Sequence, residues 1–222
     1  MTNWLGRRKV PRYPIILPVR HHVAGSDRPR SGTGWSRDLS EAGGCLELPE
    51  RFEAATVLGL SLRGDLGRIS LEATVVWTCE GRKPGAILHG VCFRPLSTRE
   101  RDALHGLLIR KRMVWQGVIR VPIDLPVTCL LRGQGRPPFH GRTENASRGG
   151  LLLRLPVVCG VGTALEVTLR TPDGPLGAEG TIVRVEPRSA QVPGIPVAHG
   201  LQFTSISPAA QMGLSRVLAD AP

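Results

Sequence analysis

The sequence contains little of several residue types that particular classes of protein require. Aromatic residues make up only 4% of the 222 residues, so the core must consist mostly of Leu, Val and Ile. The cysteines form no CxxC pair and no ligand spacing with histidine, which argues against a zinc site and a disulfide framework. We expect all five to be small buried side chains in a reducing compartment. They are Cys45, Cys79, Cys92, Cys129 and Cys159.

Long apolar segments and catalytic motifs are also missing. The chain has no run of about 18 apolar residues, and its first residues are too polar for a signal peptide. We therefore expect a soluble, cytoplasmic protein without membrane insertion. Its six histidines stand near no nucleophile motif, metal-ligand spacing or P-loop, so we expect neither an enzyme nor a metal site.

Arginine is the residue type in excess. Only Lys9, Lys83 and Lys111 are lysines among the 29 basic residues, and the formal net charge is +11. This excess favours anionic partners such as phosphates, nucleic acid or an acidic lipid surface, without choosing among them. A GC-rich genome would also produce an arginine-rich surface, so only arginines placed by a motif count as evidence.

The chain contains an internal repeat. The segment RYPIILPV at 12–19 aligns with RVPIDLPV at 120–127, with six of eight positions identical. Three more landmarks follow in the same order, which indicates a duplication. They are DLSEAG at 38–43 with NASRGG at 145–150, LELP at 46–49 with LRLP at 153–156, and GVCF at 90–93 with GLQF at 200–203. We therefore expect two domains, residues 1–110 and 111–222.

Apolar residues alternate between these landmarks, which is typical of half-buried strands. The clearest examples are Leu58, Leu60 and Leu62 in the first copy and Leu165, Val167 and Leu169 in the second. Gly-rich and Pro-rich breaks separate about six strands per copy. An amphipathic helix ends each copy, beginning at a capping box in 97–100 and at an N-cap and proline in 207–208. The predicted fold is mostly β: two tandem six-stranded antiparallel barrels, each closed by a C-terminal α-helix.

Two landmarks of the first copy resemble the motifs of the PilZ domain family. An RxxxR element runs from Arg8 to Arg12 before the first strand, and a DxSxxG element runs from Asp38 through Ser40 to Gly43 after the second. Each is uninformative alone, but their order and spacing inside a six-strand repeat are similar to the family. The resemblance covers nearly the whole chain, twice. It implies a receptor for the cyclic dinucleotide c-di-GMP, with no further cofactor.

The resemblance also implies a role for each motif residue. Arg8 and Arg12, with Arg7 extending the cluster, would contact the ligand from a flexible segment, because arginine can bind guanine O6 and N7 together or grip a phosphate. The remaining contacts would be Asp38, Ser40 and Gly43. The carboxylate accepts from the guanine N1–H and N2–H, the hydroxyl adds a polar contact, and the glycine permits the turn. Without a ligand, the same residues read as an Asx-type turn and a solvated basic terminus.

The second copy departs from the pattern at one position. Counting back from Arg120, the residue equivalent to Arg8 is Gln116. The other motif is retained, by Asn145, Ser147 and Gly150. A hydrogen bond to a charged group contributes about 1.5–3 kcal/mol net, so this loss weakens binding roughly 10- to 150-fold. We expect one strong site in residues 1–110 and a second barrel that is structural or a weak site.

Two other interpretations remain open. A nucleic-acid-binding barrel would share the strand number and the basic surface. Such proteins interleave aromatic residues for base stacking, whereas the tryptophans here are scattered, so we expect no DNA partner. A PilZ-type interaction scaffold would dock a partner without any ligand. Because we expect no output domain, a receptor must act on an unidentified effector protein, by ordering its N-terminal segment and altering docking.

Overall fold

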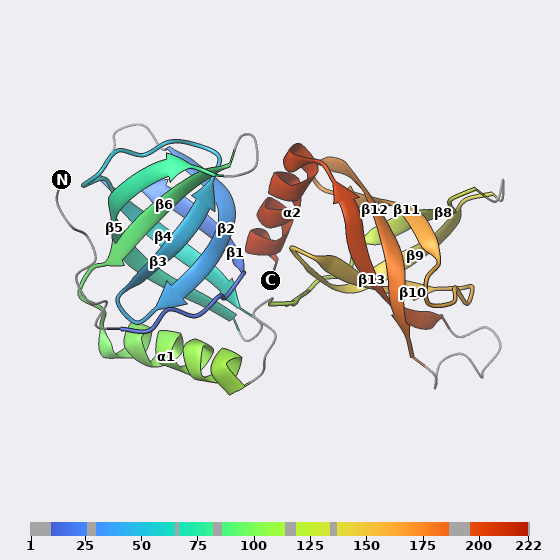
Figure 1. Ribbon diagram of the computed structural model, residues 1–222, viewed down its shortest axis with the longest axis horizontal. Helices are drawn as coiled ribbons and strands as arrows, with labels where there is room; N and C mark the ends of the chain where they lie inside the picture. The colour runs from blue at the N-terminus through green and yellow to red at the C-terminus, as the bar shows by residue number, and fades with distance from the viewer. Residues whose placement is uncertain are drawn as a thin grey trace. The chain divides into compact units, whose positions relative to one another are not determined.

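The computed structural model describes residues 10–25, 30–64, 67–81, 86–113, 119–133, 137–186 and 196–221. The chain divides into two compact units, and each unit is built around one closed barrel (Figure 1). The predicted fold class, mostly β with a six-stranded antiparallel barrel in each half, is confirmed.

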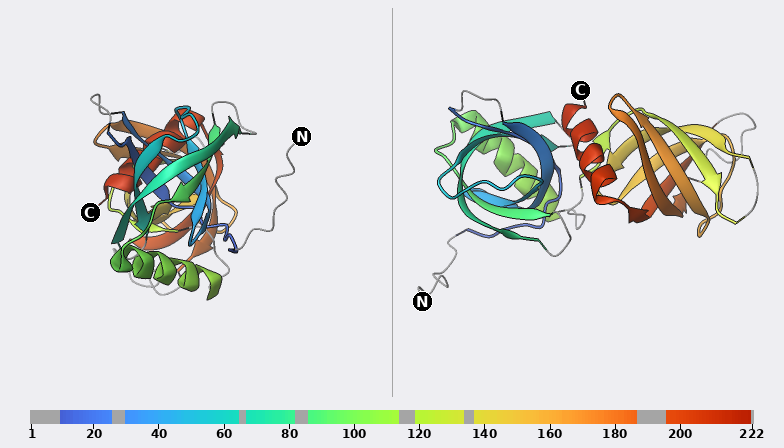
Figure 2. Two further views of the ribbon diagram at one scale, coloured as in Figure 1. Left: turned by 90° about the vertical axis from the view of Figure 1, so that its left-hand side faces the viewer. Right: turned by 90° about the horizontal axis from the view of Figure 1, so that it is seen from above.

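The first barrel is a closed ring of six strands (Figure 2). They are β1 (Pro18–Val23), β2 (Ser31–Ser40), β3 (Gly43–Leu48), β4 (Val57–Gly64), β5 (Gly67–Glu80) and β6 (Ile87–Phe93). The order around the ring is β1-β2-β3-β6-β5-β4, and β4 pairs back to β1. Helix α1 (Thr98–Met113) follows the barrel. The alternating Leu58, Leu60 and Leu62 of β4 are buried in its core, as predicted.

The second barrel repeats this ring. Its elements are β7 (Val121–Pro122), β8 (Pro126–Leu131), β9 (Phe139–Ser147), β10 (Gly150–Leu155), β11 (Ala164–Thr171), β12 (Gly174–Val185), β13 (Val197–Ile206) and helix α2 (Pro208–Asp220). The order is β10-β13-β12-β11-β8-β9, and the ring is closed by pairing of β9 with β10. The short β7 pairs with the C-terminal end of β9. Helix α2 packs against β12, where Gly213 lies close to the Leu176 side chain.

Both helices begin at the predicted residues. Ser97 N donates to Glu100 Oε2 at 2.7 Å and Glu100 N donates to Ser97 Oγ at 3.3 Å, which together form a capping box. Ser207 Oγ accepts from Ala210 N at 3.1 Å, with Pro208 at the start of the helix. Neither helix in the described part of the chain is long and apolar enough to cross a membrane.

The segment after Arg12 is not a regular strand, contrary to the sequence pattern. Strand β1 begins only at Pro18. Before it, Tyr13 forms a single bridge to β2, with Tyr13 N donating to Leu39 O at 2.8 Å and Leu39 N donating to Tyr13 O at 2.9 Å. Pro14 lacks an N–H, so it cannot extend the pairing of Tyr13 with β2. The bridge nevertheless places Arg12 beside the end of β2.

The prediction that all five cysteines are buried is wrong for two of them. Cys79 and Cys92 are exposed. Val91 and Phe93 of β6 point into the core, so Cys92 between them must face outward. In β5, a bulge after Val75 shifts the alternation and turns the end of the strand outward.

Candidate functional site

The two motifs of the first copy meet at the end of β2. Arg12 Nη1 donates to Asp38 Oδ1 at 3.0 Å, although 26 residues separate them in sequence. The two side chains are 28% and 32% exposed, so both remain accessible to a ligand. Arg7 and Arg8, the other predicted cations, lie outside the described residues, as does Gln116.

A bulge directs Asp38 to the outer face of the barrel. The register between β2 and β3 shifts between Ser36 and Asp38, so Ser36 is fully buried while Asp38 is partly exposed. Opposite Asp38 on β3 lies Cys45. Burial, reinforced by the charge of Asp38, raises the pKa of the Cys45 thiol to about 11. The thiol is therefore neutral at pH 7 and adds no charge beside the carboxylate.

Ser40 and Gly43 shape the turn between β2 and β3. Ser40 Oγ accepts from Ala42 N at 3.3 Å and donates to Gly43 O at 3.0 Å. A Cβ at Gly43 would lie 2.1 Å from Val91 O, so the glycine is required by the close approach of β6. Its backbone is not in the left-handed region, so conformational freedom is not the reason for the glycine. Both residues therefore have a clear structural role in this turn.

The same turn is connected to the helix that follows each barrel. In the first barrel, His105 Nδ1 of α1 lies 2.9 Å from Glu41 Oε1. In the second barrel, Gln211 Nε2 of α2 donates to Arg148 O at 3.4 Å. Each turn is therefore in contact with the helix that follows its barrel.

The second barrel keeps the backbone of the site but not its ion pair. Val121 pairs with Ala146 as Tyr13 pairs with Leu39 in the first barrel. The turn hydroxyl is retained as well, with Ser147 Oγ donating to Gly150 O at 3.3 Å. The amide of Asn145 carries no charge to hold the exposed Arg120, and its Oδ1 is buried without a hydrogen-bond partner in the described part of the chain.

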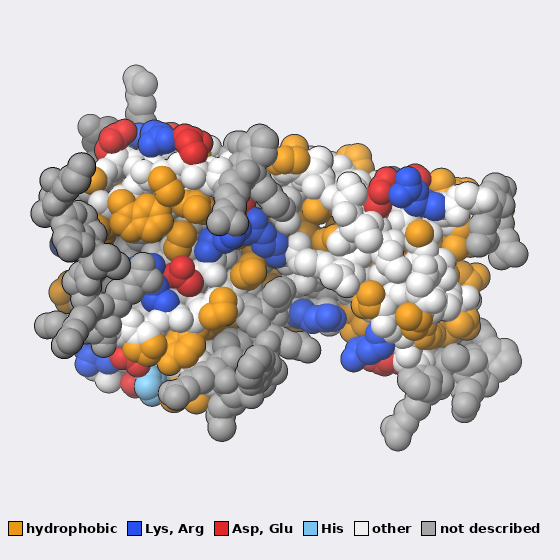
Figure 3. Space-filling model, in the orientation of Figure 1, with side chains coloured by type: hydrophobic (Ala, Val, Ile, Leu, Met, Phe, Trp, Pro, Cys, Tyr) orange, Lys and Arg blue, Asp and Glu red, His pale blue; other side chains and the backbone are white. Residues whose placement is uncertain are grey.

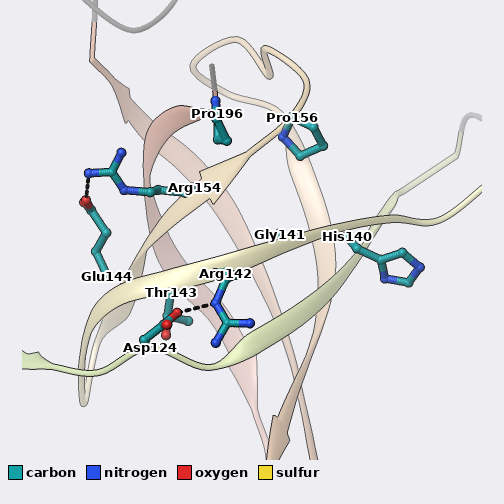
Figure 4. A pocket seen from close by; sticks show the side chains of 9 residues that line it. All are labelled: Asp124, His140, Gly141, Arg142, Thr143, Glu144, Arg154, Pro156 and Pro196. Carbon is teal, nitrogen blue, oxygen red and sulfur yellow. Dashed lines mark hydrogen bonds and ion pairs between the residues drawn. The ribbon is translucent and has the colours of Figure 1, made fainter. Parts of the chain in front are cut away.

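A hollow of about 550 Å³ lies on the second barrel beside the retained motif (Figure 4). It is lined mainly by β9 and contains two arginines. Arg142 donates to Asp124 at 2.5 Å, and Arg154 is paired with Glu144. The four side chains balance in charge, so this hollow is less suited to a doubly anionic ligand than an unpaired arginine cluster would be.

Sequence reasoning missed a pair of equivalent buried histidines. His89 Nε2 accepts from Phe52 N at 3.2 Å, and His199 Nε2 accepts from Cys159 N at 3.0 Å. Burial lowers the pKa of both imidazoles, which keeps them neutral acceptors. The sequence did contain a signal for this equivalence, because a histidine directly precedes both Gly-x-x-Phe landmarks. In each barrel, the imidazole holds the loop whose backbone N–H it accepts, at Phe52 in the first barrel and at Cys159 in the second.

Comparison with known proteins agrees with this architecture. In each barrel, the segment that precedes the first long strand pairs with the strand that leads into the turn motif. The model of the PilZ domain matches residues 6–110 and again residues 112–220. The chain therefore belongs to the PilZ domain family and carries two PilZ regions in tandem, which confirms the predicted resemblance.

A curated relative is the serine/threonine-protein kinase Pkn1 of Myxococcus xanthus. It is 33% identical over 105 residues, which are 45% of this chain and 15% of that protein. The chain thus spans only a small part of the length of this relative.

Several solved structures are similar to this chain. The inhibitor of motility MotI/DgrA of Bacillus subtilis is 11% identical, with a TM-score of 0.37, over 91% of this chain and 94% of its own. PlzA of Borreliella burgdorferi, in complex with c-di-GMP, is 13% identical, with a TM-score of 0.40, over 92% and 88%. The PilZ domain of YcgR from Escherichia coli, with c-di-GMP, is 15% identical, with a TM-score of 0.41, over 49% and 93%. Similarity at this level gives no evidence about the ligand or the mechanism of this chain.

Proposed function

We propose that the first barrel is a c-di-GMP receptor site and that the second barrel is a structural or weakly binding copy. The contact between Arg12 and Asp38 carries this proposal. It brings the cation of one motif and the carboxylate of the other to a single accessible place on the barrel. No comparable pair of opposite charges joins the equivalent residues Arg120 and Asn145, since an amide is neutral.

The chemistry of the pair suits a guanine dinucleotide. The Asp38 carboxylate accepts the guanine N1–H and N2–H, and the Arg12 guanidinium, released from Asp38, grips O6 and N7 or a phosphate. The pair is partly exposed, so separating the two groups costs little, about 1 kcal/mol or less. The ligand replaces one charge-assisted contact with several. Arg8 supplies the second cation, with Arg7 beside it.

We infer that binding is signalled through the N-terminal segment and the turn. The ligand fixes the segment that carries Arg8 and Arg12 against the barrel. It also contacts the turn that Glu41 connects to His105 of α1. Both changes alter the outer face of the first barrel and hence its docking to an effector protein.

Thermal unfolding of the full chain with different nucleotides tests the proposed ligand. We expect c-di-GMP to raise the unfolding temperature, whereas GTP and c-di-AMP at equal concentration do not, because only a specific ligand stabilises the folded state selectively. Equal shifts with all three would indicate a general anion binder. No shift with c-di-GMP at millimolar concentration would favour a ligand-independent scaffold.

Calorimetric titration tests the assignment to one barrel. We expect one strong site per chain. Two equal strong sites would contradict the proposed difference between the barrels.

A further inference from the structure

The first barrel presents an exposed tryptophan in line with Asp38. Strand pairing places Asp38 opposite Cys45, Cys45 opposite Gly90, and Gly90 opposite Trp77. Residues directly opposite each other in antiparallel strands share a face of the sheet. This row of four residues, called the β2–β5 row below, therefore crosses the outer face of the barrel from the carboxylate to the indole.

The indole lies flat on the barrel surface. A Cβ built on Gly90 would lie 2.0 Å from Trp77 Nε1 and 2.1 Å from its Cε2, so the five-membered ring covers the glycine. Trp77 is nevertheless 41% exposed. One face of the indole thus rests on backbone and the other is open to a ligand. Figure 3 shows hydrophobic side chains gathered on this face of the first barrel, beside oppositely charged side chains.

Two bulges create this arrangement. One in β2 lies between Ser36 and Asp38, and one in β5 lies between Val75 and Trp77. Without the second bulge, Trp77 would follow the buried Ala73 and Val75 into the core. Bulges often redirect a side chain beside a functional site. Here, both ends of the row are redirected to the same face.

The spacing along the row suits a ligand with two guanines. Neighbouring strands lie about 4.8 Å apart, so the indole over Gly90 is about 10 Å from Asp38. Along the row, only the small residues Cys45 and Gly90 separate Asp38 from the indole. We propose that Trp77 stacks on a guanine of the c-di-GMP bound through Asp38. This inference rests on the proposed function and adds a contact outside both sequence motifs.

The second barrel has the same row with different side chains. Asn145 lies opposite Leu152, Leu152 opposite Gly200, and Gly200 opposite Arg184. The glycine and the bulge remain, but a guanidinium paired with Glu186 at 3.1 Å replaces the indole. The indole is therefore specific to the first barrel.

Calorimetric titration of the full chain with c-di-GMP tests the role of Trp77. Base stacking on an aromatic side chain is lost on substitution by alanine, so we expect Trp77→Ala to bind about 5- to 150-fold more weakly. Trp77→Phe keeps a stacking surface and should lose less affinity than the alanine variant. Wild-type affinity in Trp77→Ala, with binding still lost in Asp38→Ala, would overturn the inference and leave the proposed function intact. No binding by the wild-type chain would overturn both.

Gly90→Ala provides a test that keeps the indole. The added Cβ must displace the Trp77 ring, which can swing outward because it is partly exposed. We expect weaker binding with a thermal unfolding midpoint close to wild type. The matched control is Gly200→Ala in the second barrel, where the nearest atom, Arg184 Cβ, is 3.3 Å away. Equal affinities of Gly90→Ala and Gly200→Ala would contradict the stacking model.

Fluorescence gives a readout that does not depend on the stability of the alanine variant. Subtracting the signal of Trp77→Phe from that of the wild type isolates the emission of Trp77. Saturating c-di-GMP should quench this difference signal, because a stacked purine covers the open face of the indole. An unchanged difference signal at saturation would also overturn the inference.

Discussion

The two barrels share the contacts that fold them and differ in the side chains that a ligand would meet. In the first barrel, Ser36 Oγ donates to Ile15 O at 2.7 Å and accepts from Leu17 N at 3.0 Å. The second barrel repeats both bonds at 2.6 and 2.9 Å, using Thr143, Ile123 and Leu125. The hydroxyl is buried in each case and satisfies backbone groups that no strand pairs.

The differences lie on the outer face. Where the first barrel has the Arg12–Asp38 pair, the second has Arg120 and the neutral Asn145. The row that ends at Trp77 in the first barrel ends at a guanidinium in the second. After duplication, buried hydrogen bonds constrain both copies, whereas exposed positions can change without unfolding the barrel. The comparison therefore separates residues that make the fold from residues that we propose make the site.

The largest expected effect is the loss of binding in Asp38→Ala. Two hydrogen bonds from guanine to a carboxylate, at about 1.5–3 kcal/mol each, correspond to at least a 100-fold loss of affinity. The matched change, Asn145→Ala, should leave the strong site unchanged in a calorimetric titration with c-di-GMP. If Asn145→Ala abolished binding instead, the strong site would lie in the second barrel.

A restored cation should strengthen the second barrel. In an Asp38→Ala background, Gln116→Arg should increase c-di-GMP affinity roughly 10- to 150-fold, because one charge-assisted contact of about 1.5–3 kcal/mol is regained. The measurement is titration with and without the added arginine. Gln116→Lys is the control, since an ammonium supplies charge without the planar fork. Equal gains from both would show that charge alone is limiting.

Acid should destabilise the first barrel more than the second. Burial lowers the pKa of His21 to about 4 and also lowers that of His89. In the second barrel, Cys129 occupies the position of His21. Among the described residues of that barrel, the lowered pKa of a buried histidine is therefore found only at His199. In the unfolded state these histidines bind protons below about pH 6.5, whereas in the folded state they do so only at lower pH. Their contribution to the free energy of unfolding is therefore fully present above that pH and is lost as pH falls. From pH 7.5 to 5, His21 alone should cost about 2 kcal/mol.

Urea unfolding can resolve the two barrels. All four tryptophans precede residue 118, so their fluorescence follows the first unit, whereas circular dichroism follows both. At pH 5, the fluorescence transition should shift to lower urea than the remaining dichroism transition. His21→Cys, which introduces the residue of the second barrel, should reduce this pH dependence. Equal shifts of the two transitions would contradict the assignment to His21.

The sequence was sufficient to predict the repeat, the barrels and the helix starts, because local patterns encode them. Alternating leucines, turn residues and the Ser97 capping box each act within a few residues. The β2–β5 row could not be predicted, because it depends on the register of four strands and on two bulges that do not alter composition. For the same reason Trp77 read as a scattered aromatic residue, and Cys79 and Cys92 were assigned to the core.

The smallest expected effect concerns the stability of the first barrel. Arg12→Ala should lower its free energy of unfolding by less than about 1 kcal/mol, because the ion pair with Asp38 is partly exposed and screened by solvent. By contrast, Ser36→Ala should cost about 1–3 kcal/mol, because it leaves buried backbone groups unsatisfied. Urea unfolding followed by tryptophan fluorescence measures both.

The order of these two effects determines how a ligand can act. If Arg12→Ala is nearly neutral, the buried Ser36 hydroxyl holds the segment before β1, and the arginine is available to leave Asp38 for a ligand at little cost. If Arg12→Ala costs more than about 2 kcal/mol, the ion pair itself anchors the segment. A ligand that separated the pair would then bind more weakly by that amount, and c-di-GMP would raise the unfolding temperature less. Measuring the two variants together with the ligand-induced shift in unfolding temperature therefore tests whether the ion pair can be separated by a ligand or is needed to hold the segment in place.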